Sequence, residues 1–394
     1  MGAGGNKMVC SDKMRQQNNV KGYRVVYLSN VPAPYTVDFY NELGKYVDLT
    51  VLFERETATD RNAEWFTGKV RYFKQIFLKG IKSKTENAFC PSVTKYLQDK
   101  NTVYIVGDYS SPTGMLALLY LKYRRVPFMI HADGGAIKNE ATIKKKIKQF
   151  FLSSGSAFFS PGKQTDDYFL YYGRKDVPIY RYPFTSIREA DVCQSVLTRE
   201  DKLKKRQKIG LYDESLVALF VGSISHRKGV DLLIKAANMV VNTCTIHVVG
   251  GIPTKEIQEQ IDREHTYNVI FHEFVKPNEV IEYMRCADIF VLPTRHDVWG
   301  LVINEAMAQG LPVITTDQCV AGVEMIKDGL NGFVIPSEDP NALAERINYF
   351  ANFPEKMYRM GIQSLIVAKE YTVEKMTTVY AQHIADFAAR NERY

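Results

Sequence analysis

Residues 297–314 read DVWGLVINEAMAQGLPVI, and this stretch decides how the chain folds. The apolar run at 289–292, just before it, is typical of a short buried strand. A helix should begin at Gly300 or Leu301 and end at Gly310, since glycine commonly stops a helix. The next apolar run then starts a further strand. The stretch therefore predicts the alternating strands and helices of an open parallel α/β sheet.

Two carboxylates flank the expected start of this helix. Asp297 precedes it and Glu305 lies about one turn inside it. Ligands of open α/β sheets bind at the carboxyl ends of the strands, and the free N–H groups of a helix N-terminus favour phosphate there. We expect the backbone of Gly300, Leu301 and Val302 to bind a phosphate, while Glu305 can accept two hydrogen bonds from a ribose diol. Taken alone, such a pair is more often a helix-capping acid and a solvated helix residue, so the functional interpretation depends on the surrounding motifs.

A second motif follows the apolar run at 216–221. The chain continues from Gly222 as GSISHRKGVDLLI, which predicts a strand, a basic loop bounded by glycine, and a helix. Arg227 can bind diphosphate oxygens in a fork, and Lys228 adds a point charge. Taken alone, Lys-Gly after a strand is also a common turn, so the functional interpretation depends on the first motif.

Together the two motifs resemble the donor site of family 4 of the retaining glycosyltransferases. Those enzymes carry two glutamates with seven residues between them. Here Glu305 matches the second, and the shorter Asp297 stands in place of the first. Ser223 replaces an arginine that usually follows the first strand. The resemblance implies the GT-B fold, in which two doubly wound, Rossmann-like parallel-sheet domains face each other across a cleft.

The resemblance also implies a reaction: transfer of a hexose, with retention, from a nucleotide diphosphate sugar to a sugar or lipid-linked hydroxyl. We expect surface polysaccharide or glycoconjugate synthesis, with a UDP- or GDP-sugar as donor and no other cofactor. In this interpretation Glu305 holds the ribose, Arg227 and Lys228 the diphosphate near Gly222, and Asp297 a sugar hydroxyl. No Asp-x-Asp motif occurs, so no metal site is expected.

The acceptor side should lie in the first half of the chain. The apolar run at 128–130 ends at His131, with Asp133 close behind it and a glycine pair following. By the resemblance, His131 orients a sugar hydroxyl or shares a proton, so we count it with Asp297, Arg227 and Lys228 as a candidate catalytic residue. A histidine satisfied within its loop is an equally good interpretation.

Two series of alternating strands and helices predict two domains. The 394 residues, 45% of them hydrophobic, are enough for two cores. We expect a disordered leader at 1–21, an acceptor domain at 22–185, a charged linker at 186–213, a donor domain at 214–370, and a helix at 371–394 that returns to the first domain. Six cysteines without metal-ligand spacing indicate a reducing, cytoplasmic location.

The net charge of +7 and a basic segment indicate an anionic partner. Lys144, Lys145, Lys146 and Lys148 could form the cationic face of a helix beside an apolar one, which suits peripheral contact with the inner face of an anionic membrane. A simple solvated face is the competing interpretation. No apolar stretch approaches the roughly 20 residues needed to span a bilayer.

Other function classes fit less well. Neither strand-to-helix junction supplies the Gly-x-Gly-x-x-Gly of a dinucleotide enzyme, and no P-loop, His-Glu-x-x-His or Gly-x-Ser-x-Gly occurs. No nucleic-acid-binding module is recognisable. The serious alternative is a catalytically weak pseudo-transferase that only binds a sugar nucleotide, because Asp297 and Ser223 depart from the family pattern.

Overall fold

The structure is a computed structural model of the chain, and it divides into two compact units. The first unit contains the residues up to Phe184 together with the segment from Val373 onward, and the second unit runs from Thr185 to Thr372. The leader expected at 1–21 lies outside the described residues, which are 22–57, 69–82, 88–137, 140–211, 214–241 and 244–391.

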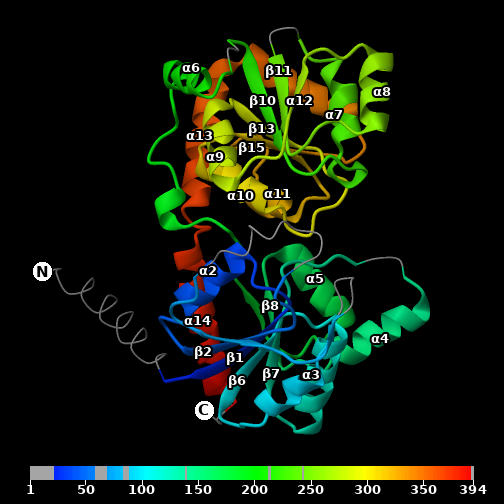
Figure 1. Cartoon of the computed structure of the whole chain (residues 1–394), viewed down its shortest axis with the longest axis vertical. Coiled ribbons are helices and arrows are strands. Elements are labelled where there is room, and N and C mark those ends of the chain that lie inside the picture. Colours follow the sequence, from blue (N-terminus) through cyan, green and yellow to red (C-terminus); the bar gives the residue numbers. More distant parts are fainter. Residues whose placement is uncertain are drawn as a thin grey trace, which may run out of the picture. The chain divides into compact units, whose positions relative to one another are not determined.

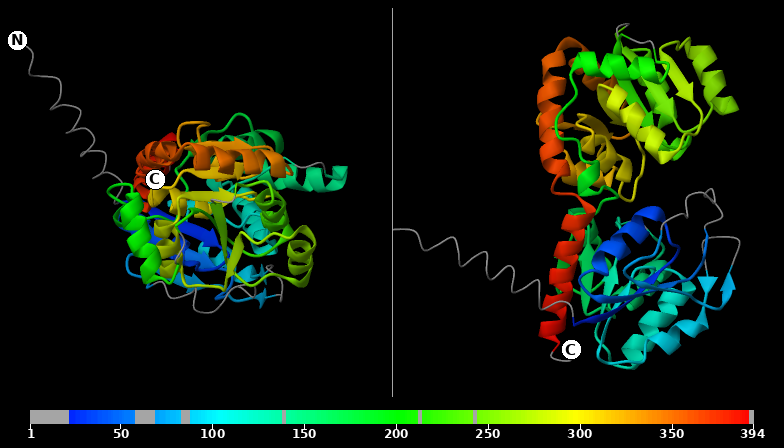
Figure 2. Two further views of the ribbon diagram at one scale, coloured as in Figure 1. Left: turned by 90° about the horizontal axis from the view of Figure 1, so that it is seen from above. Right: turned by 60° about the vertical axis from the view of Figure 1, so that its left-hand side comes forward.

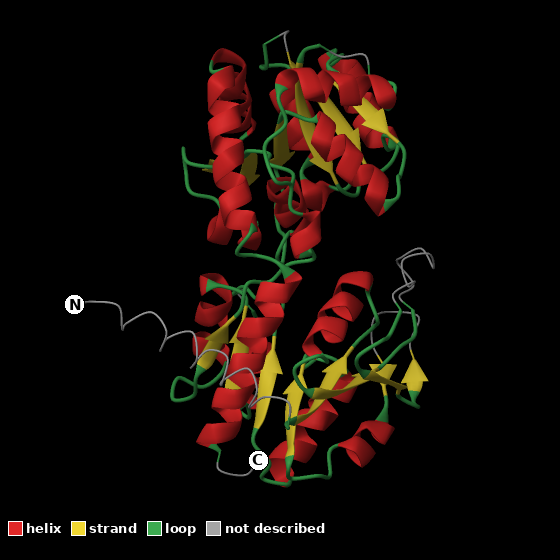
Figure 3. Cartoon of the chain, turned by 90° about the vertical axis from the view of Figure 1, so that its left-hand side faces the viewer, coloured by secondary structure: helices red, strands yellow, loops and turns green. Residues whose placement is uncertain are grey.

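The first unit is built on a seven-stranded sheet with the order β3-β2-β1-β6-β7-β8-β9, in which every neighbouring pair is parallel (Figure 1). Its central strands are continuous apolar runs because helices cover both faces of the sheet, as Figure 3 shows. The strands are β1 (Arg24–Ser29), β2 (Asp48–Phe53), β3 (Lys74–Phe77), β6 (Thr102–Val106), β7 (Phe128–His131), β8 (Ala157–Ser160) and β9 (Ile179–Arg181), with β4 (Ile81–Lys82) and β5 (Ala88–Phe89) as a separate antiparallel pair.

The last helix of the chain, α14, completes the first unit. It packs against α2, alongside the first unit in the right view of Figure 2. Its Tyr380 ring stacks on Phe159 with the centroids 3.7 Å apart. Elsewhere, Ser111 caps α3 by accepting a hydrogen bond from the backbone N–H of Gly114. The helices of this unit are α2 (Pro34–Leu43), α3 (Pro112–Tyr123), α4 (Thr142–Leu152), α5 (Lys163–Tyr172) and α14 (Val373–Arg390), and a 3-10 helix η2 (Pro91–Tyr96).

The second unit contains a six-stranded parallel sheet with the order β12-β11-β10-β13-β14-β15. Helices again lie on both faces (Figure 1). The carboxylate of Asp339 caps the helix α12 (Pro340–Asn352) by accepting a hydrogen bond from the backbone N–H of Ala342. The strands are β10 (Leu216–Val221), β11 (Cys244–Val249), β12 (Val269–His272), β13 (Ile289–Leu292), β14 (Val313–Thr316) and β15 (Gly332–Ile335).

The helices of the second unit include the one expected after Asp297, which begins at Leu301. They are α6 (Arg199–Lys208), α7 (Val230–Ala237), α8 (Lys255–Glu264), α9 (Pro277–Cys286), α10 (Leu301–Ala308), α11 (Val320–Met325), α12 (Pro340–Asn352) and α13 (Pro354–Ala368), with 3-10 helices η3 (Glu189–Asp191) and η4 (His226–Lys228). The predicted fold class, two doubly wound parallel-sheet α/β domains, is confirmed. None of the described helices combines the length and apolar composition needed to cross a membrane.

The segment 186–213, which we expected to be a linker, is part of the second unit instead. Its helix α6 packs against α9, and the side chain of Arg206 is almost completely buried. The guanidinium pairs with Asp288 at 2.6 Å and donates to the carbonyl of Cys286. Asp288, which neutralises the Arg206 charge, is 82 residues away in the sequence, so the run of basic residues alone gave no sign that Arg206 is buried.

Candidate functional site

The loop after β10 is held tightly against the end of β13. Gly229, which ends η4, has a φ of 75°, and a Cβ there would lie 1.9 Å from the carbonyl oxygen of Pro293. Only glycine fits such a close approach of two backbones. Gly222 lies at the start of this loop, directly after β10. The loop therefore presents Arg227 and Lys228 at the carboxyl edge of the sheet.

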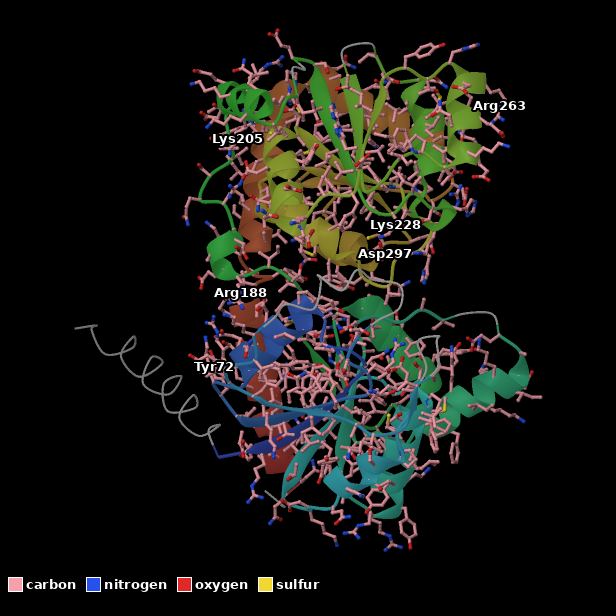
Figure 4. The ribbon with its side chains drawn as sticks, in the orientation of Figure 1. Tyr72, Arg188, Lys205, Lys228, Arg263 and Asp297 are labelled. Carbon is pink, nitrogen blue, oxygen red and sulfur yellow. The ribbon has the colours of Figure 1, made fainter. Side chains whose placement is uncertain are left out.

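Lys228 and Asp297 form an ion pair at this edge, and Figure 4 shows them side by side. The Lys228 ammonium lies 2.5 Å from Oδ2 of Asp297, and each side chain is only 13% exposed. The Arg227 guanidinium lies 3.7 Å from the other carboxylate oxygen but is 52% exposed. Two cations thus share one carboxylate, which leaves net positive charge available to an anionic ligand.

The loop that carries Asp297 leads directly into α10. The N–H of Asp297 donates to the carbonyl of Gln318 at 3.0 Å, which ties the loop to the end of β14. Gly300 is the N-cap, with a φ of 102°, and a Cβ there would lie 2.7 Å from the Cys319 sulfur. The N–H groups of the first helical turn, including those of Leu301 and Val302, have no acceptor within the helix. The first turn of α10 therefore begins beside the Asp297 carboxylate.

Glu305 lies in the second turn of α10 and is half-buried. The Ser186 hydroxyl donates to its carboxylate over 3.2 Å. Burial raises the pKa of Glu305, and the Ser186 hydrogen bond opposes that rise in part. A fully solvated helix glutamate would not need such a partner. The arrangement suits a carboxylate held in one orientation, and its role toward ribose remains a prediction.

Arg295 was missed by sequence reasoning. Its guanidinium forms two hydrogen bonds to Asp231, at 2.6 and 2.7 Å, and a third to the carbonyl of His226 at 2.6 Å. It also pairs with Glu338, and its backbone N–H donates to the carbonyl of Arg227 at 2.9 Å. Burial acts to raise the pKa of Asp231, but the bonds from Arg295 hold it below its usual value.

Arg295 therefore fixes the loop that carries Lys228. No sequence signal could have assigned this role, because the partners of Arg295 are 64 and 43 residues away. The sequence places Arg295 two residues before Asp297, which does not reveal these partners.

The first unit contains a cavity of about 270 Å³ at the carboxyl ends of β1, β2, β6 and β7. The strand order reverses between β1 and β6, and in doubly wound sheets ligands bind at this switch point. Polar groups from four strand ends meet four tyrosine rings there. The lining includes Ser29, Asn30, Arg55, Asp108, His131, Asp133, Tyr27, Tyr35, Tyr40 and Tyr182.

His131 ends β7, as expected, and lines this cavity. Its residue is only 7% exposed, and both ring nitrogens have partners: Nδ1 lies 2.8 Å from the Tyr380 hydroxyl and Nε2 lies 2.7 Å from Asp133. The Tyr182 hydroxyl is 3.2 Å from Nε2 and donates to the Ala132 carbonyl. Burial raises the pKa of Tyr182 and Tyr380 well above that of a free phenol, so both stay neutral donors. The imidazole thus has a hydrogen-bond partner at each nitrogen and also lines the cavity.

A fully buried acid, Glu54, directly precedes Arg55 of the cavity lining, and the sequence analysis missed it. The Ser111 hydroxyl donates to one of its oxygens over 2.6 Å, whereas the other oxygen has no hydrogen-bond partner within the described part of the chain. Burial, reinforced by the charge of Asp108, raises the pKa of Glu54 to about 8. Near neutral pH this carboxyl is therefore mostly protonated. In the sequence, Glu54 is simply a single acidic residue that follows an apolar strand.

Comparisons with known proteins agree with this geometry. Residues 201–364, which contain both loops of the second unit, match the family model described as "Glycosyl transferases group 1". A D-inositol 3-phosphate glycosyltransferase of Streptomyces griseus is 28% identical over 204 residues, covering 47% of this chain and 43% of that protein. Spore coat protein SA of Bacillus subtilis is 30% identical over 196 residues, covering 45% of this chain and 52% of that protein. The chain thus spans only about half, or less, of these relatives.

Solved structures match over both units. HepE (Alr3699) of Anabaena, solved with UDP and glucose, has a TM-score of 0.71 at 17% identity, covering 92% of this chain and all of that one. A sucrose-phosphate synthase of Thermosynechococcus elongatus has a TM-score of 0.71 at 14% identity, covering 93% of this chain and all of that one. At such low identity the likeness shows the fold alone, and the fold is GT-B.

Proposed function

We propose that the chain is a retaining glycosyltransferase that moves a hexose from a nucleotide diphosphate sugar to a sugar or lipid-linked hydroxyl. The observation that carries the proposal is the meeting of Arg227, Lys228 and Asp297 beside the N-terminus of α10. It lies within the stretch similar to group 1 glycosyl transferases. The pathway is one of surface polysaccharide or glycoconjugate synthesis, in the cytoplasm, with membership of family 4 as the finer assignment.

Each group has a role that follows from its position. Lys228 and Arg227 neutralise the diphosphate, whose charge grows as the bond to the sugar breaks, and the first N–H groups of α10 bind a phosphate oxygen. Glu305 accepts from the ribose hydroxyls. Asp297 accepts from a hydroxyl of the donor sugar once the diphosphate competes for Lys228. The neighbours solved with UDP support a UDP-sugar as donor, and a GDP-sugar is the second choice.

The chemical step exchanges one bond at the anomeric carbon for another. The bond to the leaving phosphate breaks with its electron pair on the phosphate oxygen, and the acceptor oxygen attacks from the same face. The acceptor proton passes to that phosphate oxygen, so neither a metal nor another cofactor is required. Configuration is retained because the attack and departure share a face.

The acceptor hydroxyl enters the cavity of the first unit. Tyrosine rings provide flat apolar surfaces for a sugar ring, while Asp133 and Asp108 can accept from its hydroxyls. At about 270 Å³ the cavity is slightly smaller than most ligand pockets, which run from roughly 300 Å³ upward, and it fits one sugar residue better than a chain. His131 holds the geometry of this wall.

One observation favours the alternative function, a catalytically weak pseudo-transferase that only binds a sugar nucleotide. The Asp297 carboxylate is already paired with Lys228, so a sugar nucleotide could bind without productive contact between Asp297 and the sugar. A panel of radiolabelled UDP-, GDP-, ADP- and dTDP-sugars separates the two functions. A transferase releases or transfers label from one of them, whereas a pseudo-transferase binds the donor and leaves it intact. No binding of any donor would contradict both.

A further inference from the structure

Helix α4 lies at the outside of the first unit and projects from its body in Figure 1 and in the left view of Figure 2. Its apolar side chains Ile143, Ile147 and Phe150 are spaced four and three residues apart and therefore share one face. They are 75%, 46% and 53% exposed. Surface helices normally turn such a stripe toward the core. Here the stripe faces outward.

The lysines of α4 do not form the single cationic face that we expected. Lys145 turns toward α5, where its ammonium donates to the exposed Tyr171 hydroxyl at 2.5 Å and lies over that ring. Lys148 pairs with Glu140 of the preceding loop at 2.5 Å. These two lysines attach α4 to α5 and the preceding loop. Lys144 and Lys146 remain exposed on either side of the apolar stripe.

Neighbouring helix α3 extends the same patch. The exposed Lys122, near its C-terminus, places its ammonium 4.9 Å from the centre of the Phe150 ring. The next residue, Tyr123, is 84% exposed. An apolar stripe bordered by cations on several sides, with an aromatic ring at its edge, is the composition of a helix that lies in a bilayer interface.

We propose that α4 is a membrane-docking helix for an anionic bilayer. Ile143, Ile147 and Phe150 enter the boundary between headgroups and acyl chains, while Lys122, Lys144 and Lys146 contact the headgroups. The occupant is an anionic bilayer because α4 carries four lysines and no acidic residue between Thr142 and Leu152, and its apolar side chains are exposed between those lysines. The roles differ within the cluster: Lys145 and Lys148 hold the helix, and Lys144 and Lys146 meet lipid.

Vesicle sedimentation of the full chain tests this docking. Vesicles that contain phosphatidylglycerol should pellet the protein, because each lysine near an anionic surface adds about 5-fold in affinity. Vesicles of pure phosphatidylcholine should pellet much less of it. Ile147→Ser with Phe150→Ser should weaken binding by at least about 10-fold. Lys144→Ala with Lys146→Ala should weaken it by roughly 25-fold, from about 5-fold for each. At about 1 M salt some binding should persist, since the apolar contact is not screened.

The matched control is Tyr358→Ser with Ile366→Ser on α13, which removes apolar side chains of similar exposure, 49% and 53%, from the second unit. It should sediment like wild type, and thermal melting should show that both variants fold.

Equal sedimentation of wild type and the Ile147, Phe150 variant would overturn the proposal. So would loss of a dimer in that variant with unchanged lipid binding, which would make the stripe a contact between two copies. Hydrolysis of the sugar nucleotide should stay normal in the α4 variant, so docking and activity can fail separately.

Discussion

The loops of the second unit and the cavity of the first unit are both at the carboxyl ends of parallel strands, yet they are built in different ways. The second-unit loops take their charged groups from two short stretches, 222–229 and 297–305. The first-unit cavity gathers side chains from four strand ends, the segment after β9, and α14. One site is local in sequence and cationic, whereas the other is assembled over long separations and dominated by tyrosines.

In the proposed function, this contrast gives the two units different chemical roles. The fixed cations beside a helix N-terminus bind the phosphates of the donor. The neutral phenols, two aspartates and buried histidine of the first unit bind the hydroxyl groups of the acceptor. Variants of the first set should therefore affect charge stabilisation, and variants of the second set should affect orientation of the acceptor.

The largest effect is expected for Lys228→Ala. Removing one group that stabilises charge in the transition state costs on the order of 100-fold or more in turnover. Initial rates of donor hydrolysis or transfer measure it. Lys235→Ala, which removes an exposed lysine from the following helix α7, is the control and should be silent. Unchanged turnover in Lys228→Ala would remove the diphosphate role from this loop.

His131→Ala tests the other region. It should lower turnover by about 100-fold through lost orientation while nucleotide affinity stays within a factor of a few. Because His131 has two buried partners, thermal melting must accompany the kinetics, and Tyr380→Phe removes one partner without emptying the cavity wall. A His131→Ala enzyme with normal turnover would make this histidine a purely structural residue. A large loss of nucleotide affinity would break the division between the two regions.

Glu305→Ala should act on binding. Losing a charge-assisted contact to ribose should weaken nucleotide affinity by roughly 1.5 to 3 kcal/mol. Calorimetry with UDP measures this, and Ser186→Ala, which removes only the hydrogen bond that orients Glu305, should cost less.

Asp297→Ala should instead lower turnover more than UDP affinity. Equal losses in both quantities would place Asp297 on the diphosphate rather than on the sugar.

Much of the fold was predictable because its signals are local. Runs such as 216–221 and 289–292 are apolar on both faces, since both faces of each sheet are covered by helices, and the start of α10 is marked by glycine. The short edge strands β3 and β9 were missed because they mix polar and apolar residues. Arg295, Glu54 and the tyrosines of the cavity owe their positions to tertiary contacts, which a single sequence does not contain.

A smaller effect concerns stability and pH. The pKa of Glu54 is raised to about 8 by burial and by Asp108, so the folded state favours the protonated carboxyl. This stability is complete below the ordinary pKa of glutamate and is lost as the pH rises from about 4.3 toward 8. Glu54→Gln should therefore raise the melting temperature at pH 8 more than at pH 5. The same shift at both pH values would show that Glu54 does not titrate in this way.

The smallest effect is expected from removal of metal ions. Treatment with EDTA should leave turnover largely unchanged, because cationic side chains and the α10 N-terminus take the place of a metal at the diphosphate. Loss of activity that Mg²⁺ or Mn²⁺ restores would show that the protein groups of this site are insufficient.

Proton NMR of the sugar first released from the donor tests the central claim most directly, because it needs no knowledge of the acceptor. With a UDP- or GDP-sugar and water as acceptor, the first-formed anomer should have the same configuration as the donor and should appear before mutarotation equilibrates it. Lys228→Ala should abolish the signal. An inverted first product would contradict the retaining mechanism, and an intact donor in the presence of proven binding would make this chain a pseudo-transferase.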